Sequence, residues 1–461
     1  MNILGKPLYS LIDLVKNKEI SPDEIYKYFI KRIKKYNYLN LFLQINKEYN
    51  SSVKPRLYGL PISLKDNICT KKLKTTASSN VLKNYVSPYN ATLVERIIKS
   101  GGFIIGKNNM DAWAHGSSTE TSDFGPSKNP WDETRTPGGS SGGSAGSVCA
   151  YLIPASIGSE TAGSIRQPCA WSGVVGLKPT YGRVSRYGII AMGSSLDSPG
   201  PIANSVKDCA LLLEIIAGKD DYDATSVNIS VDNYIGNLES KKKYVIGIPE
   251  EYFENVDADI VKNIEKSIEV LKSLGHKFKK IKLLNPKYAI SVYTIIQRAE
   301  VSSNLSRYDG IRYGNNRTFF GPEAKKRIML GTYVLSHGYY DEYYKKAQKV
   351  RTIIIENFKD VFNDVDLIIA PTTPTPALKI GDYEKYPFFG EMMDILNEPS
   401  SIACLPAISL PSGLSKNNLP TSVQIIGNYF KEQDILNVSN QFENETNFFG
   451  IKKKLLKKFP D

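Results

Sequence analysis

Cysteine and histidine are both scarce in this chain. Its 461 residues include five cysteines and three histidines. The cysteines are scattered, odd in number and form no C-x-x-C pair, which argues against a disulfide scaffold and against a zinc ribbon. The histidines are far apart and show no H-x-x-x-H spacing, so catalysis by histidine has few candidates. We expect no metal site in this chain.

Long hydrophobic runs are absent as well. No stretch approaches the roughly 18 apolar residues that a membrane-spanning helix needs. The first six residues, MNILGK, form no basic segment that leads into an apolar stretch with a cleavage site, so no secretory signal is expected. We expect a soluble chain that works in the cytoplasm, with an organellar matrix after loss of a transit peptide as the alternative.

The composition is that of an ordinary globular protein. The chain is 41% hydrophobic and 23% charged, with a mean hydropathy of −0.28, which excludes disordered and fibrous classes. Its 59 Lys and Arg residues against 47 Asp and Glu residues give a net charge of +12. Two interpretations stay open: lysine tracts on a solvated surface, such as residues 241–243 and 452–454, or a polyanionic partner such as a nucleic acid.

Short apolar strands alternate with helices along the chain. Residues 57–64 (LYGLPISL) predict a turn and a buried strand that ends at Lys65. A capping box at residues 21–24 (SPDE) begins one helix, and residues 92–99 predict another before the short strand 103–106. Such alternation indicates an α/β fold, and no internal repeat or clean domain boundary interrupts it. Further helices are predicted at 205–217, 257–274 and 337–358, and further strands at 243–249, 365–370, 407–410 and 423–426.

Two motifs rich in small residues lie close together in the sequence. Residues 138–147 read GGSSGGSAGS and residues 158–168 read GSETAGSIRQP. Gly/Ser runs are usually flexible linkers, but this one abuts an apolar segment and is followed closely by the second motif. Small residues at this density let backbone N–H groups approach a ligand, as an oxyanion hole requires. We therefore predict a functional site here.

A serine nucleophile in these motifs would need a base. The nearest histidine is His115, and no aspartate is obviously placed to orient it. A lysine is the alternative, provided that burial lowers its pKa enough to keep the amine neutral. Lys65 ends a predicted apolar strand and is therefore a candidate buried base. The competing interpretation is a lysine that is salt-bridged or that extends its amine to solvent.

Three motifs together resemble those of the amidase signature family. They are PISLKDN around Lys65, GGSSGGSAGS around Ser140 and GSETAGSIRQP around Ser164. The resemblance implies a Ser–Ser–Lys catalytic set, in which Ser164 is the nucleophile, Ser140 is the bridging serine after a cis peptide bond, and Lys65 is the base. Ser164 would attack a carboxamide carbon, and its proton would pass through Ser140 to neutral Lys65 and then to the leaving ammonia.

The same resemblance implies an oxyanion hole and a fold. The backbone N–H groups of Thr161, Ala162, Gly163 and Ser164 would stabilise the tetrahedral oxyanion. Many members of the family carry Gly where this chain has Ala162, so a positive φ at this position would strain the loop. The implied fold is a single α/β domain with a central, mixed, twisted β-sheet flanked by helices on both faces.

Much of the remaining sequence resembles one branch of this family, the glutamine-hydrolysing A subunits of tRNA-dependent amidotransferases. The likeness includes residues 107–143 and 173–202 and extends over nearly the whole chain. It implies one amidase signature domain over residues 1–461. The catalytic motifs would lie within 57–210, and the glutamine pocket and peripheral helices within 285–400.

The resemblance to this branch also implies partners, the B and C subunits of such an enzyme. Ammonia released from glutamine would travel to the first of these two partners, which uses ATP and Mg to amidate Glu-tRNA(Gln) or, as an alternative, Asp-tRNA(Asn). The second partner is small and would wrap the pair, which gives a heterotrimer. The misacylated tRNA would be held mainly through the ATP-using partner, and no cofactor is expected in this chain.

Free glutamine needs a cation for its α-carboxylate and an anion for its α-ammonium group. By resemblance, Arg327 fills the first role, Asp394 fills the second, and Tyr293 lines the same pocket. On the residues alone, the simpler interpretations are a surface charge for Arg327, which follows two lysines, and a helix cap or surface acid for Asp394.

The chain departs from the family pattern at a few places. His115 stands where the family more often has an apolar residue, and we interpret it as a packing variant rather than a base. The connection 314–323 is shorter than in most relatives, and the segment around Asn397 and Glu398 differs from the usual Thr-containing version. These departures leave the predicted chemistry in place but affect the glutamine pocket.

Two other functions compete with this prediction. A stand-alone amidase acting on another small carboxamide has the same Ser–Ser–Lys set, but it has no need for both Arg327 and Asp394. A basic RNA-binding or scaffold protein that has lost activity has no need for the Ser–Ser–Lys set, and salt-dependent tRNA binding by the isolated chain would support it.

Overall fold

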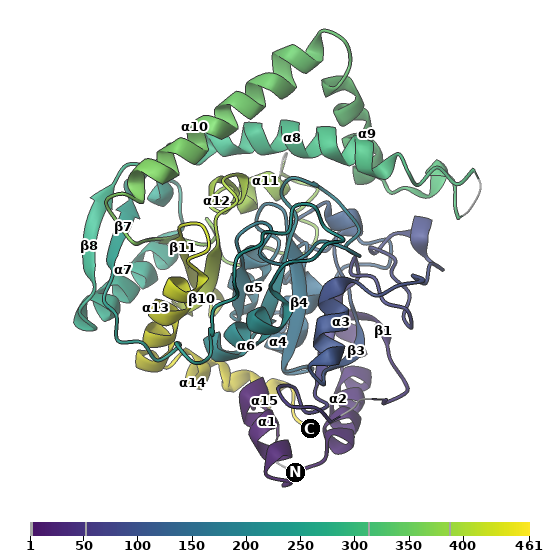
Figure 1. Ribbon diagram of the computed structural model, residues 1–461, viewed down its shortest axis with the longest axis vertical. Coiled ribbons are helices and arrows are strands. Elements are labelled where there is room, and N and C mark those ends of the chain that lie inside the picture. The colour runs from purple at the N-terminus through teal and green to yellow at the C-terminus, as the bar shows by residue number, and fades with distance from the viewer. Residues whose placement is uncertain (1–2, 51–52, 312–313, 387–388) are drawn as a thin grey trace.

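A computed structural model describes residues 3–50, 53–311, 314–386 and 389–461. These residues form a single α/β domain around an 11-stranded sheet (Figure 1). The strands lie side by side in the order β1-β3-β2-β4-β6-β5-β10-β11-β9-β7-β8. Their bounds are β1 Phe42–Ile45, β2 Pro61–Lys65, β3 Phe103–Asn108, β4 Ala155–Glu160, β5 Val175–Lys178, β6 Ser198–Ala203, β7 Val245–Pro249, β8 Lys277–Ile281, β9 Leu367–Pro371, β10 Ala407–Leu414 and β11 Pro420–Gly427.

The sheet is mixed, as predicted. Strand β2 is parallel to both β3 and β4, and β7 is parallel to both β8 and β9. The pairs β1–β3, β4–β6, β5–β6, β5–β10, β10–β11 and β9–β11 are antiparallel. Because parallel strands end at the same edge of a sheet, Lys65 at the end of β2 and Glu160 at the end of β4 lie at the same edge. The loop that follows β4 therefore begins beside Lys65.

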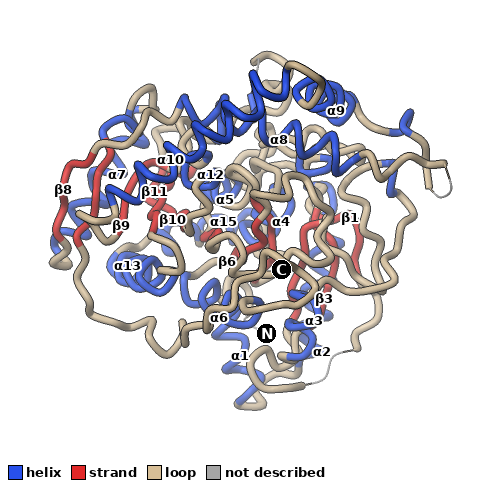
Figure 2. Tube along the Cα trace, turned by 45° about the horizontal axis from the view of Figure 1, so that its top comes forward, coloured by secondary structure: helices blue, strands red, loops and turns tan. Residues whose placement is uncertain are grey.

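Helices cover both faces of the sheet, which confirms the predicted layering (Figure 2). On β11 the Ser422 hydroxyl donates to the Ala170 carbonyl in α5, whereas a Cβ at Gly427 would touch Ile435 in α13. Side chains an odd number of residues apart on a strand point to opposite faces, so α5 and α13 lie on opposite sides. The helices are α1 Leu8–Lys16, α2 Pro22–Lys35, α3 Thr92–Lys99, α4 Gly142–Cys149, α5 Arg166–Ser172, α6 Val206–Ile216, α7 Ala258–Ser273, α8 Lys287–Leu305, α9 Pro322–Val334, α10 Lys346–Val361, α11 Phe389–Asp394, α12 Glu398–Ile402, α13 Glu432–Glu445, α14 Phe448–Lys452 and α15 Lys454–Lys458.

The local helix signals are confirmed where they are strongest. The capping box forms at the start of α2, where the Glu24 N–H donates to Ser21 Oγ at 3.2 Å and the Ser21 N–H donates to Glu24 Oε2 at 2.9 Å. Helix α3 has the predicted bounds. The helix predicted over 337–358 begins later, because a π-helical turn over Tyr340–Lys345 precedes α10.

The Gly/Ser run is not a linker. Its second half forms α4, and all eight residues of this helix are buried. Glycine and serine have low helix propensity, so packing within the domain stabilises this helix. Helix α4 lies against α5, β4 and β6. The two motifs rich in small residues are therefore in contact inside the protein.

Helix α8 packs against both α9 and α10, and the three helices lie across one end of the molecule, at the top of Figure 1. Helix α8 carries Tyr293, α9 carries Arg327, and α11, which contacts α8, carries Asp394. The three residues predicted to bind glutamine thus come from neighbouring helices. Within the described ranges, none of the helices combines the length and apolarity needed to cross a membrane.

Candidate active site

Lys65 is buried at the end of β2. Its side chain is 0% exposed, and its Nζ lies 2.7 Å from Ser140 Oγ. The same amine donates to the Ser159 carbonyl at 2.9 Å. The peptide bond between Gly139 and Ser140 is cis, as the resemblance implies. The structure thus joins two of the predicted catalytic residues through one hydrogen bond, and it excludes a Lys65 amine that extends to solvent.

Burial lowers the pKa of Lys65 to about 7. Removing the charged ammonium from water is the cause, and the carboxylates of Asp111, Asp197 and Glu160 oppose the shift without reversing it. A neutral amine has a lone pair that can accept a proton from Ser140 while one N–H remains on the Ser159 carbonyl. The neutral lysine that the predicted chemistry requires is therefore available near neutral pH.

Ser164 lies in the loop between β4 and α5. Its carbonyl accepts the N–H of Ser141 at 3.1 Å, which ties the two serine motifs together next to Ser140. Ser164 itself is 4% exposed. The hydroxyls of Ser140 and Ser164 do not hydrogen-bond to each other in the described part of the chain. Such bonds are often long without substrate and shorten when it binds.

The loop of residues 161–164 presents free backbone donors. Among the residues that the structure describes, the four N–H groups of this loop have no acceptor. The loop is held by its other atoms instead. Thr161 Oγ1 donates to Asp197 Oδ1 at 2.6 Å, and the Ala162 carbonyl accepts from Ser401 Oγ at 2.5 Å. Fixed N–H groups without partners are the feature that an oxyanion hole needs.

Alanine is accommodated at position 162, whereas a side chain at position 163 would displace Asp394. The φ of Ala162 is not positive, so the strain considered from the sequence does not arise. A Cβ at Gly163 would lie 2.2 Å from Asp394 Oδ1, far inside contact distance. The predicted oxyanion loop and the predicted glutamine-binding carboxylate are thus in direct contact.

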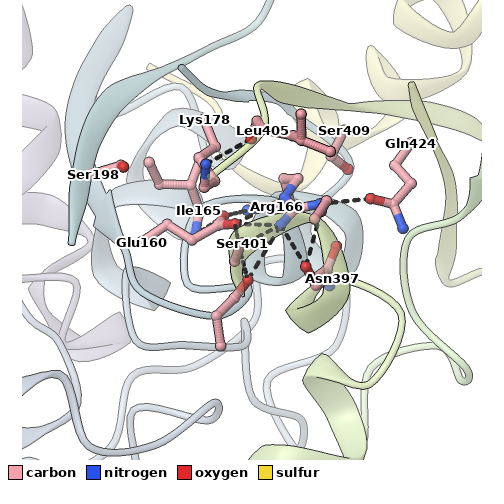
Figure 3. Close-up of polar contacts among 12 residues, drawn as sticks. Glu160, Ile165, Arg166, Lys178, Ser198, Asn397, Ser401, Leu405, Ser409 and Gln424 are labelled. Atoms are coloured by element: carbon pink, nitrogen blue, oxygen red, sulfur yellow. Dashed lines mark hydrogen bonds and ion pairs between the residues drawn. The ribbon is translucent and has the colours of Figure 1, made fainter. Parts of the chain in front are cut away.

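A buried ion pair between Glu160 and Arg166 supports this loop (Figure 3). Arg166 Nη2 lies 2.6 Å from Glu160 Oε1, and both side chains are 0% exposed. Glu160 Oε2 also accepts the N–H groups of Ile165 and Arg166 at 3.0 Å each. Burial acts to raise the pKa of Glu160, but the charge of Arg166 holds this pKa below its usual range. The two residues that follow Ser164 are therefore anchored to one carboxylate.

No role for Glu160 or Arg166 was predicted from the sequence, although both stand in the motif around Ser164. The available signal was a glutamate and an arginine six residues apart, with mostly small residues between them. Arg166 also reaches segments far along the chain. Its guanidinium donates to Ser400 Oγ at 2.9 Å, Ser401 Oγ at 2.9 Å, Gln424 Oε1 at 2.6 Å and the Asn397 carbonyl at 3.0 Å.

We expect Arg166→Met to lower the free energy of unfolding by about 3–5 kcal/mol, because it leaves Glu160 charged and buried without a cation. The exposed pair of Lys272 and Glu269, which are 49% and 69% exposed, provides the control. Lys272→Met should cost less than about 1 kcal/mol. Urea denaturation followed by circular dichroism measures both variants. Similar losses for the two would contradict this view of the pair.

Asp111 anchors the segment that leads to Ser140, and it was not identified from the sequence. Asp111 Oδ2 accepts the N–H groups of Ser118 at 3.2 Å and Thr119 at 2.9 Å, and its own N–H donates to the Ser140 carbonyl at 3.3 Å. A Cβ at Gly139 would lie 2.0 Å from Asp111 Oδ2. Only glycine therefore lets the chain pass this carboxylate on its way to Ser140.

Arg327 is buried and is not a surface charge. It is 4% exposed; its Nε lies 2.7 Å from Glu323 Oε1 and its Nη2 3.9 Å from Glu391 Oε1. Arg298 of α8 pairs with the same Glu391 oxygen at 2.5 Å. Arg298, Arg327 and Glu391 help to line a cavity of about 290 Å³. Arg298 and Glu391, which share this site with Arg327, were not predicted from the sequence.

Asp394 is buried too, and only one of its two carboxylate oxygens accepts a hydrogen bond from the described residues. Oδ2 accepts the Ser117 hydroxyl at 2.8 Å, whereas Oδ1, the atom beside Gly163, has no partner among the described residues. Burial raises the pKa of Asp394 well above its usual value. Burial also raises the pKa of Tyr293, against the charge of Arg327. The charges of Arg327 and Asp394 thus both act on the Tyr293 hydroxyl.

His115 is fully buried, and neither ring nitrogen has a hydrogen-bond partner in the described part of the chain. Burial lowers the pKa of His115 well below its usual value, and the charges of Arg327 and Arg298 lower it further. A ring that touches no hydroxyl in this way is not placed to activate a serine. Within the described ranges, no three His, Cys, Asp or Glu side chains gather to hold a metal ion.

Known proteins share this sequence and fold. The amidase family model matches residues 32–436. Among the glutamyl-tRNA(Gln) amidotransferase A subunits, that of Halothermothrix orenii is 46% identical over 478 residues, which cover 99% of this chain and 100% of that protein. The protein of the same name from Sulfurihydrogenibium sp. is 45% identical over 492 residues and is covered in full, as is this chain.

A solved structure agrees with these relatives. The crystal structure of the protein of the same name from Thermotoga maritima matches with a TM-score of 0.83 at 41% identity. The match covers 92% of this chain and 91% of that one. The chain therefore belongs to the amidase family, in the branch of the glutamyl-tRNA(Gln) amidotransferase A subunits.

Proposed function

We propose that this chain is the glutaminase subunit of a tRNA-dependent amidotransferase, and that it hydrolyses glutamine with Lys65, Ser140 and Ser164. One observation carries the proposal. A buried carboxylate oxygen without a partner among the described residues, Oδ1 of Asp394, lies against Gly163, directly beside Ser164. An amino-acid substrate brings an ammonium group for such an oxygen, and its side-chain amide then lies near the serine.

The reaction begins with attack of Ser164 Oγ on the side-chain carboxamide carbon of glutamine. The proton of Ser164 passes to Ser140 Oγ as the Ser140 proton passes to Lys65 Nζ, 2.7 Å away. Lys65 returns this proton, through Ser140, to the amide nitrogen, the carbon–nitrogen bond breaks and ammonia leaves. Water then enters and hydrolyses the γ-glutamyl ester on Ser164, which yields glutamate and restores the serine.

The negative oxygen of the tetrahedral intermediate needs donors. The N–H groups of Thr161, Ala162, Gly163 and Ser164 have no acceptor in the described part of the chain and are our candidates for this role. Glu160 and Arg166 would fix the loop so that these donors do not reorganise during the reaction. Removal of one such donor typically costs about 10²–10³-fold in rate.

The rest of the substrate would be held by the helices above the loop. Arg327 would bind the α-carboxylate through its guanidinium, which has Glu323 and Glu391 as neighbours, and Asp394 would bind the α-ammonium group. Tyr293, which is 5% exposed, would line the pocket between them. We assign the catalytic motifs to 57–210 and the pocket to 285–400 of one domain over 1–461.

The released ammonia would serve partner proteins. By analogy with the branch to which the chain belongs, we propose a heterotrimer with the B and C subunits of the amidotransferase. The first of these would bind ATP and Mg and amidate Glu-tRNA(Gln), with Asp-tRNA(Asn) as the alternative acceptor, and it would hold most of the tRNA. We place this reaction in the cytoplasm, where tRNA is charged.

Ammonia release from glutamine by the full chain, alone and with the B and C subunits, tests the proposal. We expect release that depends on the partners, and we expect Arg327→Ala to raise KM for glutamine by about 10- to 100-fold, the size of a lost hydrogen bond to a charged group. Lys325→Ala, two residues away, should leave KM unchanged. Robust release from other carboxamides by the chain alone, with glutamine a poor substrate, would indicate a stand-alone amidase instead.

A further inference from the structure

Glu398 is a buried carboxylic acid that the reaction described so far does not use. It is the first residue of α12 and is 0% exposed. Neither of its two oxygens has a hydrogen-bond partner among the residues that the structure describes. A buried polar group without a partner costs free energy, more so when it is an acid. Such a side chain needs a hydrogen-bond partner that the described residues do not supply.

Chain geometry places Glu398 beside Asp394. A tight turn joins α11 to α12, in which the Asn397 N–H donates to the Asp394 carbonyl at 2.7 Å. Residues four apart along a helical path lie on the same face. Asn397, between them, also contacts the active-site loop, because a Cβ at Gly163 would lie 3.0 Å from its Nδ2. Asp394 and Glu398 are therefore neighbours next to the active-site loop.

The surrounding residues agree with this placement. Helix α12 packs against α8, which carries Tyr293, and the charges of both Glu398 and Asp394 help to raise the pKa of the Tyr293 hydroxyl. The charge of Asp394 also helps burial to raise the pKa of Glu398. The two carboxyls thus face one region and repel each other when both are ionised.

The cations of this region are already paired with other acids. Arg298 and Arg327 both contact Glu391, and Arg327 also contacts Glu323. Within the described ranges, neither Asp394 nor Glu398 forms an ion pair. Four buried oxygens consequently remain without donors there among the described residues: Oδ1 of Asp394, Oδ1 of Asn397 and both oxygens of Glu398. Three of them belong to carboxyl groups, and an ammonium group, with three N–H donors and a positive charge, suits such acceptors.

We propose that Glu398 is a second carboxylate of the amino-acid subsite and, together with Asp394, receives the α-ammonium group of glutamine. This inference rests on the proposed glutaminase function and extends it. One carboxylate would be enough to bind the ammonium group. A second adds discrimination, because an analogue without the amino group leaves both acids buried and without a donor.

Binding of two ligands to the full chain with Ser164→Ala, assembled with its partner proteins, tests the proposal by calorimetry. The ligands are L-glutamine and glutaramate, which is glutamine without its amino group. Glu398→Gln keeps the shape and removes the charge. We expect it to raise the Kd for glutamine about 10- to 100-fold, the range for a lost hydrogen bond to a charged group, and to leave the Kd for glutaramate nearly unchanged.

Two further variants make the result decisive. Glu398→Leu, which buries an apolar side chain of similar volume, should weaken glutamine binding in the same selective way and provides the test if Glu398→Gln does not fold. Glu443→Gln is the matched control, since Glu443 lies on α13 and accepts the Val206 N–H at 3.1 Å, away from the pocket. It should leave both dissociation constants unchanged.

The outcomes separate this inference from the function on which it rests. If Glu398→Gln weakens both ligands equally, Glu398 has only a structural role, and if it weakens neither, Glu398 does not contact the amino acid. Either result overturns the inference while glutamine still binds to the chain with Ser164→Ala. If that chain binds no glutamine at all, the proposed function fails, and the assignment of Glu398 fails with it.

Discussion

We expect Ser164→Ala to reduce ammonia release from glutamine by on the order of 10⁵-fold or more, as removal of the nucleophile does in other serine hydrolases. The reason is that no covalent intermediate can form without the Ser164 hydroxyl. Glutamine binding should persist, because the groups assigned to the substrate lie on other residues. Ammonia release by the complete complex and a glutamine dissociation constant together measure this split between catalysis and binding.

A neighbouring serine provides the control for this result. Ser147 is buried in α4, and its hydroxyl donates to the Ser144 carbonyl at 2.9 Å, outside the proposed proton path. Ser147→Ala removes this bond and the one that the hydroxyl accepts from Asn108 Nδ2 at 3.3 Å, so it should lose on the order of 2 kcal/mol of stability and should keep its activity. Residual turnover in Ser164→Ala that resembles that of Ser147→Ala would mean that another residue attacks the amide.

The candidate catalytic residues were assigned from the sequence through the resemblance of three motifs to a known family, and local patterns supplied part of the argument. Lys65 follows a short apolar run, and such a run predicts a buried strand whose last residue is shielded from water. The two serines stand in motifs of small residues that leave room for backbone donors. The α/β fold follows from the alternation of strands and helices, whereas the full order of the 11 strands does not, because most neighbours in the sheet are distant in sequence.

The contacts that hold Arg166 could not be predicted either, because its partners are distant in sequence. Arg166 is held by Asn397, Ser401 and Gln424, which lie more than 200 residues further along the chain. Nothing in the linear order shows that α12 and β11 pack beside α5. The helical state of α4 was also missed, since its glycines and serines favour a linker by propensity and only burial overrides that preference.

Activity should also depend on pH through the protonation of Lys65. We expect kcat/KM for glutamine to rise about tenfold per pH unit below pH 7 and to level off above it. The sign follows from the lowered pKa of Lys65, about 7: below this value the amine is protonated and cannot accept the Ser140 proton, and above it the amine is neutral. Initial rates of ammonia release between pH 5.5 and 8.5, a span of about three units around that pKa, measure the profile.

Lys65→Met tests whether the rise of kcat/KM below pH 7 is caused by the titration of Lys65. The variant should lose about 10²–10⁴-fold in rate, the usual contribution of a general base, and its remaining activity should no longer rise through pH 7. Lys452→Met is the matched control, because Lys452 is fully buried with a pKa lowered to about 8, yet it lies on α14 beside Asn204. Lys452→Met should keep the rise of kcat/KM below pH 7. If Lys65→Met kept this rise as well, the group that titrates near pH 7 would be another residue. The proton path from Ser164 through Ser140 would then have to end elsewhere.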